Sequence, residues 1–174
     1  SDGSMKYEDL ASRSVFVRMV SGTKNPAILT GLPDLGKGNY LEASYKMDSG
    51  RMMPAAGITN VNVEYKDILG AVRFATIEWS VGSISELENL IPHFLTPGRT
   101  ALLDFGWSYK KDFTNKDSHS LFDDSNNSIH ERAKKGAMGV VQENGGDYEG
   151  IFGIITNFSY DLKEDGTFNC MTKL

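Results

Sequence analysis

Apolar and polar residues alternate in two neighbouring stretches of the chain, the pattern of strands with one buried face. The first stretch, Ile58–Tyr65, has its core positions at Val61, Val63 and Tyr65. The second, Val72–Ser80, has them at Ala75, Ile77 and Trp79. Because only a short turn separates the two stretches, they predict an antiparallel hairpin.

A second hairpin is predicted at the end of the chain. Ile151–Leu162 is expected to pair with Thr167–Lys173, and Gly166 in the intervening turn supplies a positive φ angle. Ile154 and Phe158 are its expected core or assembly residues.

Further strands are predicted from β-branched and aromatic runs. Ser14–Val20 is the first, and Thr100–Trp107 carries Leu103, Phe105 and Trp107 on one face. Two short strands are expected at Ala27–Thr30 and Leu41–Tyr45.

One amphipathic helix is predicted at Ser83–Ile91. Ser83 and Glu86 have the spacing of a capping box, in which each side chain accepts a hydrogen bond from a free backbone N–H. Leu87 and Leu90 belong to its apolar stripe, and Pro92 is expected to end or kink the helix.

Two long polar segments interrupt this pattern: a loop at 21–57 and a surface insertion at 110–147, with a short helix at Ser128–Lys135. Residues 1–5 have the character of a cloning remnant. The whole chain, 1–174, is therefore expected to be a single mainly β domain, an antiparallel β-barrel with one packed helix and two long loops.

Composition narrows the function. The formal net charge of the 174 residues is −5, which disfavours a nucleic-acid-binding surface. Cys170 is the single cysteine, so neither an intrachain disulfide nor a cysteine-based zinc site is possible. The chain has no apolar run long enough to suggest a membrane span.

Candidate catalytic and cofactor motifs are weak. Gly31–Gly38 matches a phosphate-binding loop up to its lysine, but Gly38 stands where Ser or Thr should follow. His93, His119 and His130 lack metal-site spacing, and the acidic run near Asp124 lacks the glycine and glutamate of a calcium loop. We therefore expect no enzyme activity, cofactor or metal; a hydrolase would rest only on scattered carboxylates.

The strand aromatics are interpreted mainly as core residues. They are Trp79, Phe105, Trp107, Phe152, Phe158, Tyr160 and Phe168. The alternative function is a glycan- or ligand-binding β-domain that uses loop aromatics. Its candidate residues are Tyr109, Phe113, Phe122 and Tyr148.

The order of elements resembles a known family. A hairpin strand ending in Ala75–Trp79 and a capped helix precede Leu95–Trp107, which contains Pro97-Gly98 and Gly106-Trp107. Gly150–Tyr160 then leads into the closing hairpin. This order is similar to the first β-barrel domain of baseplate hub and tail-tube proteins of contractile phage tails and related injection systems.

The resemblance implies a mechanical role in the virion. A domain of this kind would assemble with copies of itself, as a ring or trimer, between the tail tube and the baseplate or spike. DNA would be only passing cargo in its channel, and no membrane would be involved. Assembly would take place in the cytoplasm of the bacterial host.

Overall fold

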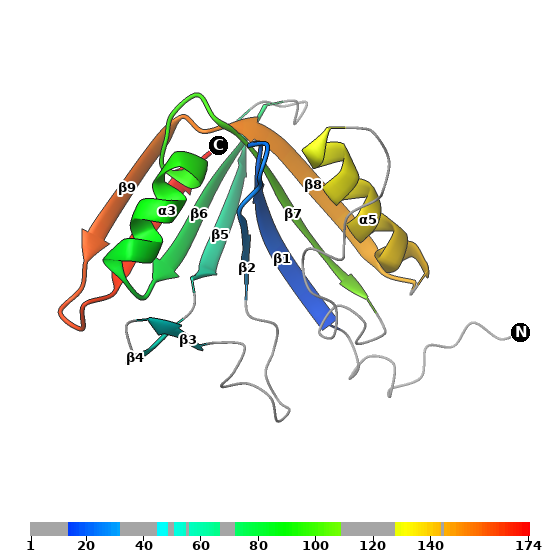
Figure 1. Ribbon diagram of the computed structural model, residues 1–174. Coiled ribbons are helices and arrows are strands. Elements are labelled where there is room, and N and C mark those ends of the chain that lie inside the picture. Colours follow the sequence, from blue (N-terminus) through cyan, green and yellow to red (C-terminus); the bar gives the residue numbers. More distant parts are fainter. Residues whose placement is uncertain are drawn as a thin grey trace, which may run out of the picture.

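The computed structural model describes residues 14–31, 45–48, 51–54, 56–66, 72–108, 128–143 and 145–174 (Figure 1). These residues form a mainly β structure with two helices. The strands are β1 (Ser14–Ser21), β2 (Ile28–Thr30), β3 (Tyr45–Asp48), β4 (Arg51–Pro54), β5 (Gly57–Tyr65), β6 (Arg73–Val81), β7 (Thr100–Ser108), β8 (Asp147–Ile154), β9 (Asn157–Leu162) and β10 (Phe168–Lys173). The helices are α3 (Ile84–Phe94) and α5 (Ile129–Glu143).

Two four-stranded antiparallel sheets form the body of the domain. Sheet A has the order β2-β1-β7-β8, and sheet B has the order β5-β6-β10-β9. The predicted hairpin is confirmed in β5 and β6, where Val61 pairs with Ile77 and Val63 with Ala75. A separate hairpin, β3–β4, lies within the segment that was expected to be a loop.

The prediction of a single strand at Ile151–Leu162 is wrong. The chain bends at Ile155-Thr156, so that β8 belongs to sheet A and β9 to sheet B. Backbone hydrogen bonds hold this corner, because Ile155 N–H donates to the Arg99 carbonyl and Thr156 N–H to the Lys173 carbonyl. The β9–β10 part of the predicted hairpin is confirmed, and Gly166 in its turn has φ 84°.

The described residues do not form the expected closed barrel. On one side, the only described link between the sheets is a parallel bridge between Gly31, just after β2, and Ile58 of β5. Past this bridge, β1 and β5 face each other without backbone hydrogen bonds between them. On the other side, β8 and β9 are consecutive parts of one bent segment, and each pairs with a different sheet. The result is two sheets joined at a corner and a bridge.

The core lies between the two sheets. Sheet A contributes Met19, Ala101 and Leu103, and sheet B contributes Ile77 and Trp79, all with at most 1% exposure. The sheets approach closely at Gly153, where a Cβ atom would lie 3.1 Å from the Leu174 Cβ.

Helix α3 packs against the core-facing side of sheet B. Ser83 caps it as predicted, since its hydroxyl accepts a hydrogen bond from Glu86 N–H. The helix runs through Pro92 to Phe94, one turn beyond the predicted end, because a proline in the last turn costs only a single backbone hydrogen bond. The Thr172 hydroxyl then donates to the Phe94 carbonyl and accepts from the Trp79 indole N–H.

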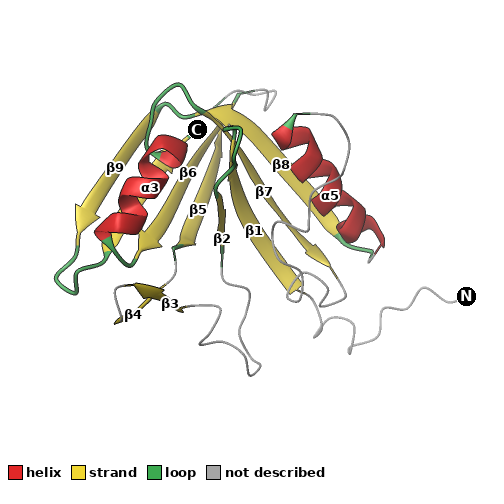
Figure 2. Ribbon diagram, in the orientation of Figure 1, coloured by secondary structure: helices red, strands yellow, loops and turns green. Residues whose placement is uncertain are grey.

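Helix α5 corrects the expectation of an irregular insertion at 110–147 with one short helix. It has 15 residues, and Figure 2 shows it beside β8, while α3 lies on the other sheet. Ala133, Ala137 and Val141 are fully buried at every fourth position. Such a stripe of small side chains is only weakly apolar, which explains why the pattern suggested a shorter helix.

Candidate assembly surfaces

The residues predicted to serve the core or assembly occupy three environments. Ile77, Trp79, Leu87 and Leu103 are buried. Val61, Val63, Leu90, Phe105 and Phe158 are partly buried against the core, and Trp107 is half-buried. Tyr65 and Ile154 lie on the surface, with 56% and 55% exposure. Both are at strand ends or edges, where the facing sheet does not cover them.

The interpretation of the strand aromatics as core residues is wrong for Phe152 and Tyr160. Phe152 is 59% exposed on β8, and Tyr160 is 49% exposed on β9. Leu162, two residues after Tyr160 and on the same face, is 67% exposed. These strands are the outer strands of sheets A and B, so their alternating apolar side chains reach solvent.

One face of sheet B is polar. By the strand register, the side chains that alternate with the buried ones share this face, and most are exposed. They are Asn60, Asn62, Glu64, Phe74, Thr76, Glu78, Ser80, Asn157, Ser159, Asp161, Asn169, Met171 and Lys173. Both described helices pack elsewhere, α3 on the opposite face and α5 on sheet A. Three carboxylates, Glu64, Glu78 and Asp161, face two ammonium groups here, Lys173 and Lys66, and Lys66 forms an ion pair with Glu64, so the face has a small negative charge.

The two outer strands of sheet B, β5 and β9, border the polar face on opposite sides. Beyond the Gly31–Ile58 bridge, β5 pairs with no described strand on its outer side. In the described residues, β9 likewise pairs only with β10. Sheet edges with free backbone N–H and C=O groups are templates for pairing with another chain.

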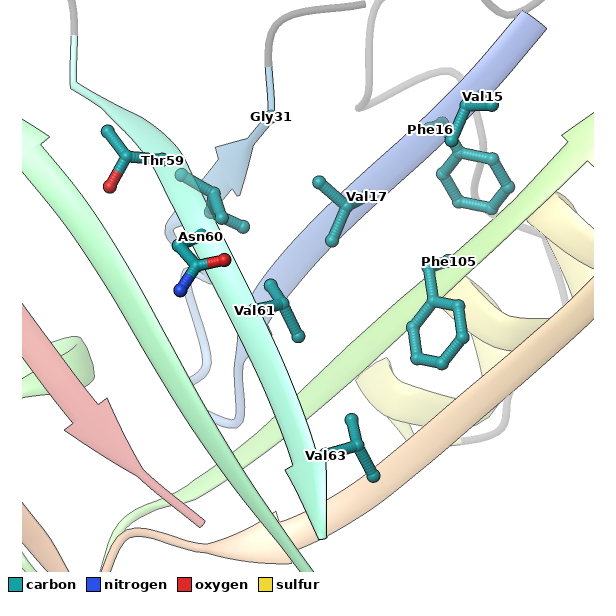
Figure 3. Close-up of a pocket in the computed structure, with 10 residues that line it drawn as sticks. Val15, Phe16, Val17, Gly31, Thr59, Asn60, Val61, Val63 and Phe105 are labelled. Carbon is teal, nitrogen blue, oxygen red and sulfur yellow. The ribbon is translucent and has the colours of Figure 1, made fainter.

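An apolar groove of about 580 Å³ opens between β1 and β5 (Figure 3). It begins beyond Gly31, where β2 stops. Val17 from β1, Val61 and Val63 from β5 and Phe105 from β7 surround the gap in Figure 3. Val15, farther along β1, is 65% exposed. The groove therefore combines free strand edges with an apolar lining.

A buried polar network lies beneath α5, and its two charged residues, Arg18 and Asp104, were not among the predicted site residues. The Arg18 Nε donates to Asp104 Oδ1 at 3.0 Å, and its Nη2 donates to Asp104 Oδ2 at 2.6 Å. The same Nη2 donates to the Ala133 carbonyl of α5, and the Tyr148 hydroxyl donates to Asp104 Oδ2. The sequence signal was two opposite charges, each placed inside an otherwise apolar strand.

Two of the three histidines lie in the described residues, and each contacts hydroxyl groups. His93 Nδ1 lies 2.9 Å from Ser21 Oγ and 3.0 Å from Thr23 Oγ1. Burial, with a smaller effect of Arg99, lowers the pKa of His93. Ser21 is fully buried and already accepts from Ala27 N–H, so this contact ties α3 to the β1–β2 turn rather than presenting a nucleophile.

His130 lies at the start of α5. Its Nε2 is 3.2 Å from Thr100 Oγ1, and its ring packs edge-on against Phe152. Its Nδ1 is buried and has no hydrogen-bond partner within the part of the chain that the structure describes, and burial lowers the pKa of His130. This environment favours the neutral imidazole.

Of the four loop aromatics that were candidates for ligand binding, only Tyr148 lies in the described residues. Tyr148 stacks on Phe16, and burial followed by the nearby Asp104 charge raises the pKa of its hydroxyl, so its ring is no open glycan platform. Residues 109–127, including Tyr109, Phe113, Phe122, His119 and Asp124, lie outside the described residues, as do residues 1–5 and 32–44, which hold most of the glycine-rich motif.

The described residues hold no cluster of three or more potential metal ligands. No helix among them has the length and apolar character to cross a membrane. Comparison of the chain with family models, curated proteins and solved structures gave no match.

Proposed function

We propose that this chain is a structural assembly domain of a phage tail baseplate hub or tail tube, in which copies form a ring around a channel. One observation carries the proposal: sheet B presents a polar, weakly acidic face between two edge strands that, apart from the Gly31–Ile58 bridge, have no outer partner among the described residues. A sheet of this kind can continue from one copy to the next and leave its polar face toward an aqueous lumen.

The charge of the polar face suits a channel that passes DNA. Glu64, Glu78 and Asp161 outnumber Lys66 and Lys173 there, and the whole chain has a formal charge of −5. Like charges repel, so an acidic lumen would let DNA pass without retaining it. The proposed partners are further copies of the chain, a tail-tube protein and a baseplate or spike protein, within the virion.

The proposal is tested by measuring assembly and DNA retention together. Light scattering after gel filtration and electron microscopy, with and without a tube protein of the same particle, should show rings or trimers. A variant with Glu64→Lys, Glu78→Lys and Asp161→Lys should assemble but retain double-stranded DNA at low salt, whereas the parent should not. A chain that stays monomeric at high concentration with its tube protein present would refute the proposal.

A further inference from the structure

We infer that the groove between β1 and β5 binds strand β9 of a second copy, with Tyr160 and Leu162 of that copy entering it. This inference rests on the proposed function for its partner. It specifies which surfaces of the two copies meet and which side chains become buried between them.

Strand direction permits the pairing. Sheet B is antiparallel throughout, so β5, β6, β10 and β9 alternate in direction. The two edge strands of one copy therefore run in opposite directions. When β9 of one copy lies beside β5 of the next in a rotational ring, the two strands are antiparallel, and the alternation continues across the contact.

The side-chain faces also match. Phe158, Tyr160 and Leu162 lie on the core-facing side of sheet B, because they pair through β10 with buried positions of that side. Val61 and Val63 of β5 are on the same side and line the groove. In a continuous sheet, apolar side chains of β9 therefore meet the apolar groove, while Ser159 and Asp161 extend the polar face.

Burial gives the contact its driving force. Leu162 and Tyr160 are 67% and 49% exposed in the isolated chain, although their strand has the period-two pattern of a half-buried element. The groove they would enter lacks a strand among the described residues. Each copy thus has an apolar edge strand on one side and an apolar opening on the other, which is the requirement for a head-to-tail interface.

Cysteine cross-linking tests the contact directly. Each of Asn60, Asn62 and Glu64 on β5 is replaced by Cys together with each of Ser159 and Asp161 on β9, to sample the possible registers. Within one copy, β6 and β10 separate these strands by about 14 Å, too far for a disulfide, so any bond formed joins two copies. The native Cys170 is 3% exposed, and burial raises its pKa to about 12, so it should not compete.

At least one of these pairs should give a ladder of cross-linked oligomers on oxidation. The control pair Asn62→Cys with Glu131→Cys, which uses an exposed residue of α5, should give none. Assembled rings in which none of the β5–β9 pairs cross-links would overturn this inference and leave the proposed function standing. Absence of any association would overturn both.

A charge substitution supplies the second test. Leu162→Asp should weaken self-association about 30-fold or more, because it removes an apolar side chain from the interface and buries a charge. Ser159→Asp places the same charge on the polar face of the same strand and should leave association within about threefold of the parent. Circular dichroism and thermal unfolding establish that both variants fold. Equal effects of the two substitutions would contradict the inference.

Discussion

The two sheets differ in how many of their faces are buried. In sheet A, Met19 and Leu103 face the core between the sheets, while Val20 and Leu102 on the opposite face are covered by α5. In sheet B, Ile77 faces the core, but its neighbours Thr76 and Glu78 belong to the polar face.

The two sheets are therefore expected to contribute differently to folding and to the proposed assembly. In sheet A, which is buried on both faces, Arg18 pairs with Asp104 and also donates a hydrogen bond to α5. The sheet buried on one face leaves the other face and most of its two edges uncovered by described residues, and the proposed assembly would use these surfaces. Substitutions at equivalent strand positions should therefore have unequal effects in the two sheets.

The largest effect is expected beneath α5. Asp104→Asn keeps the shape of the side chain but removes the carboxylate that pairs with the Arg18 guanidinium, which is 1% exposed. Removing one partner of a buried ion pair should lower the free energy of unfolding by about 3–5 kcal/mol. Urea denaturation monitored by tryptophan fluorescence measures this loss.

The matched control is the double variant Arg18→Met with Asp104→Asn. It removes the guanidinium charge as well, and the amide oxygen introduced by the second substitution can still accept from the Tyr148 hydroxyl, so much of the lost stability should return. A single variant that loses less than about 1 kcal/mol would show that water reaches the pair and that sheet A is less completely covered than its exposure indicates.

The next effect compares two adjacent residues of β6. Ile77→Ala removes a fully buried side chain and should destabilise the domain by about 2–4 kcal/mol. Thr76→Ala, on the polar face, should change the free energy of unfolding by no more than about 0.5 kcal/mol. Equal losses at the two positions would mean that the polar face is covered within the monomer.

A smaller effect is expected where α3 joins sheet B. Thr172→Val is close to isosteric but leaves the Trp79 indole N–H and the Phe94 carbonyl without the hydroxyl they share. An unsatisfied buried polar group should cost about 1–3 kcal/mol in the free energy of unfolding. Met171→Leu, on the neighbouring position of β10 but the opposite face, is the control, and it should unfold at nearly the parental urea concentration.

The sequence allowed the strands to be predicted where the alternation was strong. The pairing of Val61 with Ile77 and the cap at Ser83 needed only local pattern and spacing. The corner at Ile155 was not predictable in this way, because apolar residues continue across it and only the competing pairings with β7 and β10 make the chain bend.

The candidate assembly surfaces could be predicted from the sequence less well than the strands. Tyr160 and Val61 occupy similar alternating patterns on the two edge strands of sheet B, yet Tyr160 is 49% exposed and Val61 is partly buried beside the groove. Whether an alternating residue is core or interface depends on the order of strands in the sheet. That order follows from contacts between distant segments, not from any local motif.

The smallest predicted effect concerns pH and compares His130 beside sheet A with Glu64 on the polar face of sheet B. Burial lowers the pKa of His130, which lies over sheet A, so protons bind the unfolded chain more readily than the folded one. The stability that this difference provides is complete above the unfolded histidine pKa of about 6.5 and is lost as the pH falls below it. On sheet B, hydrogen bonding and charge from Lys66 lower the pKa of Glu64, so its contribution is lost only near and below pH about 4.5.

Urea denaturation of the parent should therefore show a free energy of unfolding that declines between pH 7 and pH 5. In His130→Gln this decline should be shallower, since the imidazole no longer titrates, whereas Glu64→Gln should retain the parental slope in that range. If His130→Gln kept the full slope and Glu64→Gln removed it, folding would not change the protonation of His130. The loss of stability between pH 7 and pH 5 would then originate at Glu64 on sheet B, which is the opposite of what we expect.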